Sequence, residues 1–151
     1  MKKILALDIA TKTGWKTVTT SGTWNFKIKS GETDGMKIIR FKSKVKEMIL
    51  AEDINLVVYE RAASQFRNSL IAESEMIGVL KLLIEELKSD RNIKVELACF
   101  SAKEIKKHAT GNGNANKDAM VKKAIELGYK PCDDNEADAI HIYRMAESEF
   151  N

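Results

Sequence analysis

Two short apolar runs, each closed by a carboxylate, constrain the fold of this chain most strongly. Residues 3–10 (KILALDIA) and 54–59 (INLVVY) are rich in leucine and β-branched residues, which is typical of buried strands. Asp8 lies near the exit of the first run, and Glu60 directly follows the second. A buried carboxylate is costly unless a cation, a hydrogen-bond donor or solvent lies beside it. One such acid is explained equally well by exposure to water, but two of them favour a functional site.

The remaining segments alternate between strand and helix patterns. Apolar residues at spacings of three and four predict helices, and alternating patterns between Gly-rich or polar segments predict strands. Ser101 and Glu104 have the spacing of a capping box, which predicts a helix that begins there. The expected elements are a turn at 11–14, strands at 15–19, 23–28 and 93–99, and helices at 36–51, 67–88, 117–127 and 135–148. The helix capped by Ser101 is short and precedes a loop at 110–116.

The length of 151 residues suits one domain, spanning 1–151. No segment rich in Gly, Ser or Pro suggests a linker. The mixture of strands and helices predicts an α/β fold with three strands at the start of the chain.

Several classes of protein are disfavoured by composition. The longest apolar runs fall far short of the roughly 20 residues of a membrane span, and Asp8 interrupts the apolar start before a signal peptide is complete. We therefore expect a cytoplasmic protein without a membrane partner. Cys99 and Cys132 lack CxxC spacing, so we expect reduced thiols rather than a zinc site or a disulfide.

Charge is distributed unevenly along the chain. The net charge of +3 is too small to indicate nucleic-acid binding by itself. However, basic residues outnumber acids in 36–50 and 101–123, whereas acids dominate from Cys132 onward. Basic surfaces beside an acidic patch suit a protein that holds a polyanion next to bound cations.

The acidic patch contains a pair of aspartates one helical turn apart. Asp134 and Asp138 would lie on the same face of the last helix. Asp134 alone is explained by stabilisation of the helix N-terminus. Asp138 stands between two alanines and close to the buried stripe of the helix, so exposure to solvent explains it less well.

Convergent acids of this kind suit Mg²⁺, with Mn²⁺ as a substitute, and a pair of ions can activate water and stabilise the leaving oxygen of a phosphodiester. Zinc is disfavoured because His108 and His141 have no His or Cys at ligand spacing. His141 follows Asp138 by three residues and is either a proton carrier or ligand at the site, or a histidine on the helix face.

Four segments in order resemble the RuvC family of Holliday-junction resolvases, within the RNase H-like nuclease superfamily. They are ALDIATKTGW (6–15), VVYE (57–60), SAKEIKKHATGNGNANKDAMV (101–121) and EADAIHI (136–142). The resemblance implies an RNase H-like fold, with a five-stranded mixed sheet flanked by helices. It also implies a homodimer with two active sites that nicks four-way DNA with Mg²⁺. From the convergent acids we expect two ions per site, held by Asp8, Glu60, Asp138 and a fourth acid.

The resemblance places Lys106 and Lys117 where the family's basic residues meet DNA phosphates near the scissile bond, with Lys106 as a catalytic residue. Phosphate contacts position a substrate without reading its bases. Phe66 either stacks on an unpaired base of the junction or packs under the long helix. Arg61 and Arg67 flank this segment and favour contact with DNA.

This chain departs from the family pattern in two places. Asp8-Ile9-Ala10 replaces the usual Asp-Pro-Gly, and the usual spacing of the last two acids would place the first of them at Asn135. Asp134 or Glu136 must then substitute, and we favour Asp134 because it shares a face with Asp138. These departures resemble the phage-borne branch, so we expect action in the cytoplasm of a bacterial host and a substrate range that extends to forks and other branched DNA.

Three alternatives stay open. An RNase H-like nuclease could act on RNA–DNA hybrids, and a non-catalytic protein that binds branched DNA could retain the acids for structure. The segment from Asp8 to Gly14 also resembles the phosphate loop of actin-like kinases and ATPases. Those proteins close a cleft between two domains, and the length of this chain disfavours that class.

Overall fold

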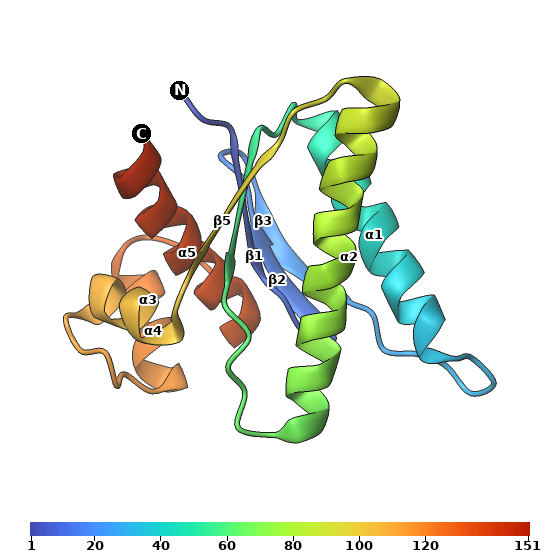
Figure 1. Ribbon diagram of the computed structural model, residues 1–151. Helices are drawn as coiled ribbons and strands as arrows, with labels where there is room; N and C mark the ends of the chain where they lie inside the picture. The colour runs from blue at the N-terminus through green and yellow to red at the C-terminus, as the bar shows by residue number, and fades with distance from the viewer.

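The computed structural model describes residues 1–151 and contains one five-stranded sheet (Figure 1). The strand order is β3-β2-β1-β4-β5, in which β1, β3, β4 and β5 run in one direction and β2 runs antiparallel to them. The strands are β1 (Ile4–Asp8), β2 (Lys12–Lys16), β3 (Ser21–Asn25), β4 (Leu56–Glu60) and β5 (Glu96–Phe100). The helices are α1 (Asp34–Ala51), α2 (Arg67–Arg91), α3 (Ala102–Thr110), α4 (Lys117–Glu126) and α5 (Asp134–Phe150).

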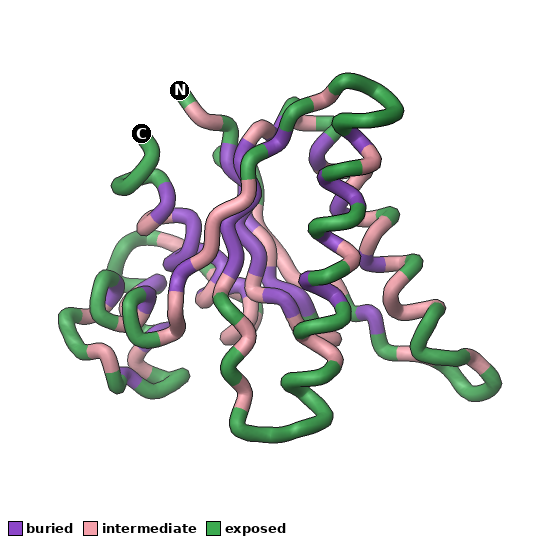
Figure 2. Tube along the Cα trace, viewed as in Figure 1, coloured by how far each residue is buried: buried purple, intermediate pink, exposed green.

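Helices cover both faces of the sheet, α1 and α2 on one side and α3, α4 and α5 on the other (Figure 1). Side chains alternate along each strand, so β1 contributes to a separate core on each face. Leu5 and Leu7 join the core under α1 and α2, whereas Ile4 and Ala6 join the core under α3 and α5. Figure 2 shows the buried residues concentrated in the central strands between these layers.

The first hairpin differs from the sequence-based expectation. Residues 11–14 were expected to turn, but β2 already begins at Lys12, and the hairpin turn lies at 17–20, where the Thr17 amide donates to the Thr20 carbonyl at 2.8 Å. Gly14 and Gly22 lie inside strands rather than in turns. In both cases the missing side chain leaves room for a neighbour: the Asn135 backbone at Gly14 and the Trp15 ring at Gly22.

The helix ends follow local capping chemistry. Ser101 and Glu104 form the expected capping box on α3, with Glu104 N to Ser101 Oγ at 3.2 Å and Ser101 N to Glu104 Oε2 at 2.8 Å. Asp133 caps α5 by accepting from the Glu136 amide at 2.8 Å. α2 extends to Arg91, beyond the expected end, and stops at Asn92 in the left-handed region (φ 54°). None of the helices has the length and apolar character required to cross a membrane.

Candidate active site

Asp8 and Glu60 lie side by side at the ends of neighbouring parallel strands. Leu7 pairs with Tyr59 in the β1–β4 ladder, and the two acids are the next residue on each strand. Strand alternation directs both side chains toward the sheet face covered by α5, the face that also buries Ala6 and Val58. The sheet thus brings together two carboxylates that are far apart in the sequence.

α5 brings the third carboxylate to the same place because it packs across β1 and β2. Asp138 lies in the second turn of α5 and is partly buried, and Asp134 lies in the first turn. The close approach depends on Gly14, which pairs with Asp8 in the β1–β2 ladder. A Cβ on Gly14 would overlap the carbonyl of Asn135, so a side chain there would push away the N-terminus of α5.

The acids perturb one another strongly. Burial raises the pKa of Asp8 well above its usual value, and the negative charges of Asp138, Glu60, Glu73 and Asp134 raise it further. Burial, followed by repulsion from Glu60 and Asp134, raises the pKa of Asp138 to about 7. Burial and the charge of Glu73 also raise the pKa of Glu60. The cluster therefore carries more negative charge than its surroundings neutralise.

Glu73 was not identified from the sequence. It lies on α2, whose N-terminal part passes the end of the sheet where Asp8 and Glu60 emerge. In the sequence it is one of several polar residues in a helical segment (AESE, 72–75), and its position in the helical pattern is the same as that of a solvent-exposed acid. Only the tertiary position of α2 distinguishes it.

The donor set suits a hard divalent cation by chemistry and charge. Carboxylate oxygens are the ligands that Mg²⁺ and Mn²⁺ prefer, and a cation would relieve the repulsion that raises the pKa values of Asp8 and Asp138. No three His, Cys, Asp or Glu side chains stand close enough together to hold a common ion in this structure. The acids are thus an electrostatically coupled group rather than a closed ligand cage.

Two lysines lie at the acidic cluster. The charge of Lys106 on α3 lowers the pKa of both Glu60 and Asp138, opposing the effect of the neighbouring acids. Lys117 begins α4, and its Nζ lies 3.4 Å from Asp134 Oδ2. The Lys117 side chain is 83% exposed, so it is available to a ligand outside the protein.

Glu136 has a structural role. Its carboxylate accepts from Ser21 Oγ at 2.6 Å and from the Cys132 amide at 2.9 Å, which ties the start of α5 to β3. These hydrogen bonds outweigh the effect of burial and lower the pKa of Glu136. The family pattern expects an acid at the position of Asn135, and either Asp134 or Glu136 could take over its role. Because Glu136 is held by these hydrogen bonds, Asp134 is the one that remains available at the site.

His141 is buried away from the cluster, contrary to the idea that it acts there as a proton carrier or ligand. Its Nε2 lies 2.8 Å from the Met120 carbonyl of α4, and burial lowers its pKa. Phe66 is 71% exposed at the start of α2, so the alternative that it packs in the core is wrong. Arg61 follows β4 and Arg67 begins α2, and both are exposed.

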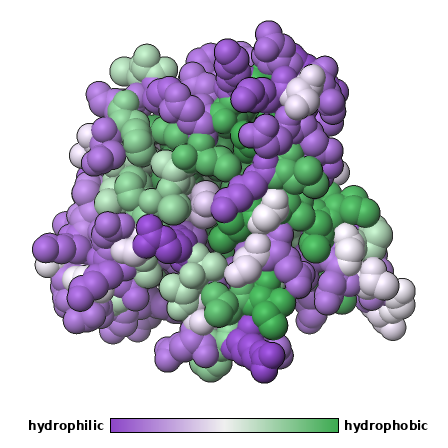
Figure 3. All heavy atoms as spheres, viewed as in Figure 1, coloured by the Kyte–Doolittle hydropathy of each residue, from purple (hydrophilic) through white to green (hydrophobic).

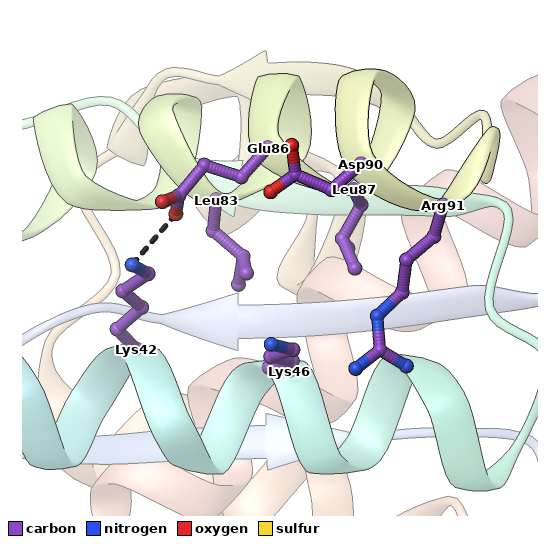
Figure 4. Close-up of a pocket in the computed structure, with 7 residues that line it drawn as sticks. All are labelled: Lys42, Lys46, Leu83, Glu86, Leu87, Asp90 and Arg91. Carbon is purple, nitrogen blue, oxygen red and sulfur yellow. Dashed lines mark ion pairs between the residues drawn. The ribbon is translucent and has the colours of Figure 1, made fainter.

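A small pocket lies between α1 and α2, on the far side of the sheet from Asp138 (Figure 4). Its volume is only about 60 Å³. Lys42 Nζ and Glu86 Oε1 form an ion pair of 2.6 Å across it, and Leu83 lines it beside this pair. These contacts join two packed helices, and the pocket contains none of the clustered acids.

Comparison with known proteins decides the family. A family model described as crossover junction endodeoxyribonuclease RuvC matches residues 26–144. The chain belongs to the RuvC family. The crossover junction endodeoxyribonuclease RuvC of Brachyspira hyodysenteriae is 36% identical over 73 residues, which are 48% of this chain and 41% of that relative. The match thus spans less than half the length of this curated relative.

Solved RuvC structures share the fold. Thermus thermophilus RuvC superposes with a TM-score of 0.73 at 16% identity, covering 97% of this chain and 95% of that one. T. thermophilus RuvC in complex with Holliday junction substrate gives 0.71 at 15% identity, covering 94% and 90%. The yeast mitochondrial Holliday junction resolvase gives 0.65 at 11%, covering 93% and 75%. The expected RNase H-like fold and the RuvC resemblance are both confirmed.

Proposed function

We propose that this RuvC-family chain is a metal-dependent structure-selective endodeoxyribonuclease that nicks Holliday junctions and other branched DNA. The observation that carries the proposal is the meeting of Asp8, Glu60 and Asp138 from two strands and α5, where burial and neighbouring negative charges raise the pKa values of all three. Family membership supports the endonuclease class, and the RuvC structure solved with a Holliday junction supports the substrate.

In this proposal Asp8, Glu60, Asp138 and Asp134 hold two Mg²⁺ ions, which Mn²⁺ can replace. When bound, such ions supply an activated water and stabilise the leaving oxygen of the phosphodiester. Asp138, whose pKa is about 7, must lose its proton before it can serve as a ligand. The protein thus couples metal binding to pH.

The lysines act on the phosphate. Lys106 lies near Glu60 and Asp138, where its charge offsets negative charge on the phosphate that reacts. Lys117 is exposed beside Asp134 and holds a neighbouring phosphate in position. Both roles require charge rather than recognition of a base.

The segment after β4 supplies contacts with an opened junction. Phe66 is 71% exposed, which is unusual for a phenylalanine, and it presents its ring to solvent. A ring at this position can stack on an unpaired base at the crossover. Arg61 and Arg67 lie on either side and meet the adjacent phosphates.

A homodimer is part of the proposal, with α2 as the contact. Ile71, Gly78 and Leu82 lie on the outward face of α2, with Ile71 and Leu82 being 46% and 53% exposed. A Cβ at Gly78 would meet nothing within 4 Å, so no contact inside the chain requires glycine in this helix. Figure 3 shows apolar side chains at the centre of the face that carries β5 and α2, bordered by polar ones.

The decisive experiment compares cleavage of labelled four-way junction, three-way fork, linear duplex and RNA–DNA hybrid in Mg²⁺ and in Mn²⁺. We expect nicks in the branched DNA and little cutting of linear duplex. Asp8→Asn should abolish nicking and leave junction binding intact or stronger, because a metal ligand and a negative charge are lost. Preferential cutting of the hybrid would support an RNase H-like activity instead. Binding of junctions without any cutting would reduce the protein to a branched-DNA-binding protein.

A further inference from the structure

A groove beside the clustered acids contains a carboxylate with no assigned role. It has a volume of about 380 Å³ and opens between the loop after β1, the N-terminal part of α2 and the starts of α4 and α5. Its lining includes Lys12, Ser69, Glu73, Lys117, Asp134 and Asn135. The volume is several times the roughly 30 Å³ that one water occupies in the liquid, so hydrated ions fit there.

Glu73 faces the same groove as Asp134 from the opposite wall. Asp134 has a cationic partner, since Lys117 Nζ lies 3.4 Å from its Oδ2. Glu73 has none, although two lysines line the groove, and burial raises its pKa. Its charge also raises the pKa of both Asp8 and Glu60, which places it within electrostatic reach of the two strand-end acids.

A carboxylate in this position is unfavourable for binding a polyanion. A DNA strand that enters between Lys12 and Lys117 would bring phosphates toward Glu73, and like charges repel. A divalent cation between carboxylate and phosphate reverses the sign of this interaction. Glu73 therefore fits the groove if a cation is bound there, and opposes DNA binding if none is.

We infer that Glu73 is a further metal-binding carboxylate of the active site, supplied by α2 across the groove from Asp134. This inference rests on the proposed nuclease function and deepens it. It extends the acidic set beyond the β1, β4 and α5 residues, and it gives α2 a direct part in holding the cation.

Glu73→Gln tests the inference because it removes the charge and preserves the size of the side chain. Mn²⁺ binding to the full chain without DNA, measured by isothermal titration calorimetry at pH 8, gives a readout separate from cleavage. We expect the affinity to fall by roughly tenfold. The Tm of the metal-free protein should be unchanged or higher, because an unpaired and partly buried charge is removed.

Two variants make the result specific. Glu75→Gln changes an exposed acid on the same helix that lines a different hollow, with Asp34 and Lys37, and it should leave Mn²⁺ affinity unchanged. Asp8→Asn should weaken Mn²⁺ binding at least as much as Glu73→Gln. In EDTA, Glu73→Gln should bind a four-way junction more tightly than the unaltered protein does.

The outcomes separate the two proposals. If Asp8→Asn weakens Mn²⁺ binding and Glu73→Gln does not, the role of Glu73 is refuted and the proposed function stands. If neither variant changes Mn²⁺ affinity, the metal site of the proposed function fails together with the inference. If Glu73→Gln lowers Mn²⁺ affinity and the metal-free Tm together, Glu73 is a structural residue and the inference is wrong.

Discussion

The main chain of Asn135 lies so close to Gly14 that no side chain fits at position 14. A Cβ there would overlap the Asn135 carbonyl and lie 3.1 Å from the Glu136 amide. Gly14 pairs with Asp8 across the β1–β2 ladder, and Asn135 lies in the first turn of α5. One missing side chain thus sets how closely the helix that carries Asp134 and Asp138 approaches the strand that carries Asp8.

Gly14→Ala should therefore damage both stability and activity. Forcing a methyl group against backbone atoms costs about 1–3 kcal/mol, and the helix must shift to relieve the overlap. We expect a lower Tm by differential scanning calorimetry and a loss of junction cleavage larger than the loss of folded protein explains. Gly35→Ala is the matched control, because its Cβ would make only an ordinary 3.4 Å contact with Thr33. Equal Tm values for the two variants would contradict this account of Gly14.

Asp138 should make the stability of the metal-free protein fall with rising pH. Its pKa is about 7 in the folded chain and about 3.8 in the unfolded chain, so between these values the folded state holds the extra proton. The contribution of Asp138 to the free energy of unfolding is full below pH 3.8, falls up to pH 7 and changes little above it.

Asp138→Asn isolates this contribution from those of the other acids. Urea unfolding at several pH values in EDTA should show that the variant gains stability relative to the unaltered protein as pH rises from 4 to 7. Saturating Mn²⁺ should stabilise the unaltered protein and so remove much of the variant's advantage, because the bound ion takes the place of the proton on Asp138. A stability difference that is independent of pH would show that Asp138 titrates normally.

Lys117→Ala should weaken DNA binding through charge alone. The side chain is 83% exposed, so folding depends little on it, and its loss removes one phosphate contact. The slope of log affinity against log salt concentration for a four-way junction in EDTA should decrease in magnitude by about one. Lys122→Ala removes an exposed lysine of the same helix and should leave the slope unchanged. An unaltered slope in Lys117→Ala would place this residue off the DNA path.

Leu82→Glu should dissociate the proposed dimer. A charge on the outward face of α2 cannot be buried against a second copy without a large desolvation penalty. Sedimentation equilibrium should show monomers at concentrations where the unaltered chain is dimeric. Ile125→Glu alters a similarly exposed residue on α4, 58% against 53% for Leu82, and should leave assembly intact. If both variants assemble like the unaltered chain, the contact lies elsewhere.

The parts of the fold that depend on local patterns were predictable from the sequence. The buried strands β1 and β4 and the capping box of α3 were expected, since each is specified by neighbouring residues. The β2–β3 hairpin was misplaced because Gly14 and Gly22 look like turn residues. Glycine is needed at both positions because other groups of the protein approach the backbone there, and sequence periodicity carries no information about such contacts.

The acids of the site also fall into those that the sequence predicts and those that only the tertiary structure identifies. Asp8, Glu60 and Asp138 stand out in the sequence because each interrupts an otherwise apolar environment. Glu73 does not stand out, since it lies among other polar residues, and the sequence offered Glu136 only as an alternative to Asp134. Only tertiary structure shows that Glu136 is held by Ser21 and Cys132, and that Glu73 faces the groove.

The distribution of the acids along the chain has a consequence during synthesis. Asp8 belongs to the first strand, whereas Asp138 belongs to α5, which packs across β1 and β2. A ribosome that has produced β1 and β4 has therefore made two of the acids without the helix that completes the group. If the chain cleaves DNA as proposed, its acidic site is incomplete until α5 emerges and docks, so the order of translation would delay the activity until the fold is finished.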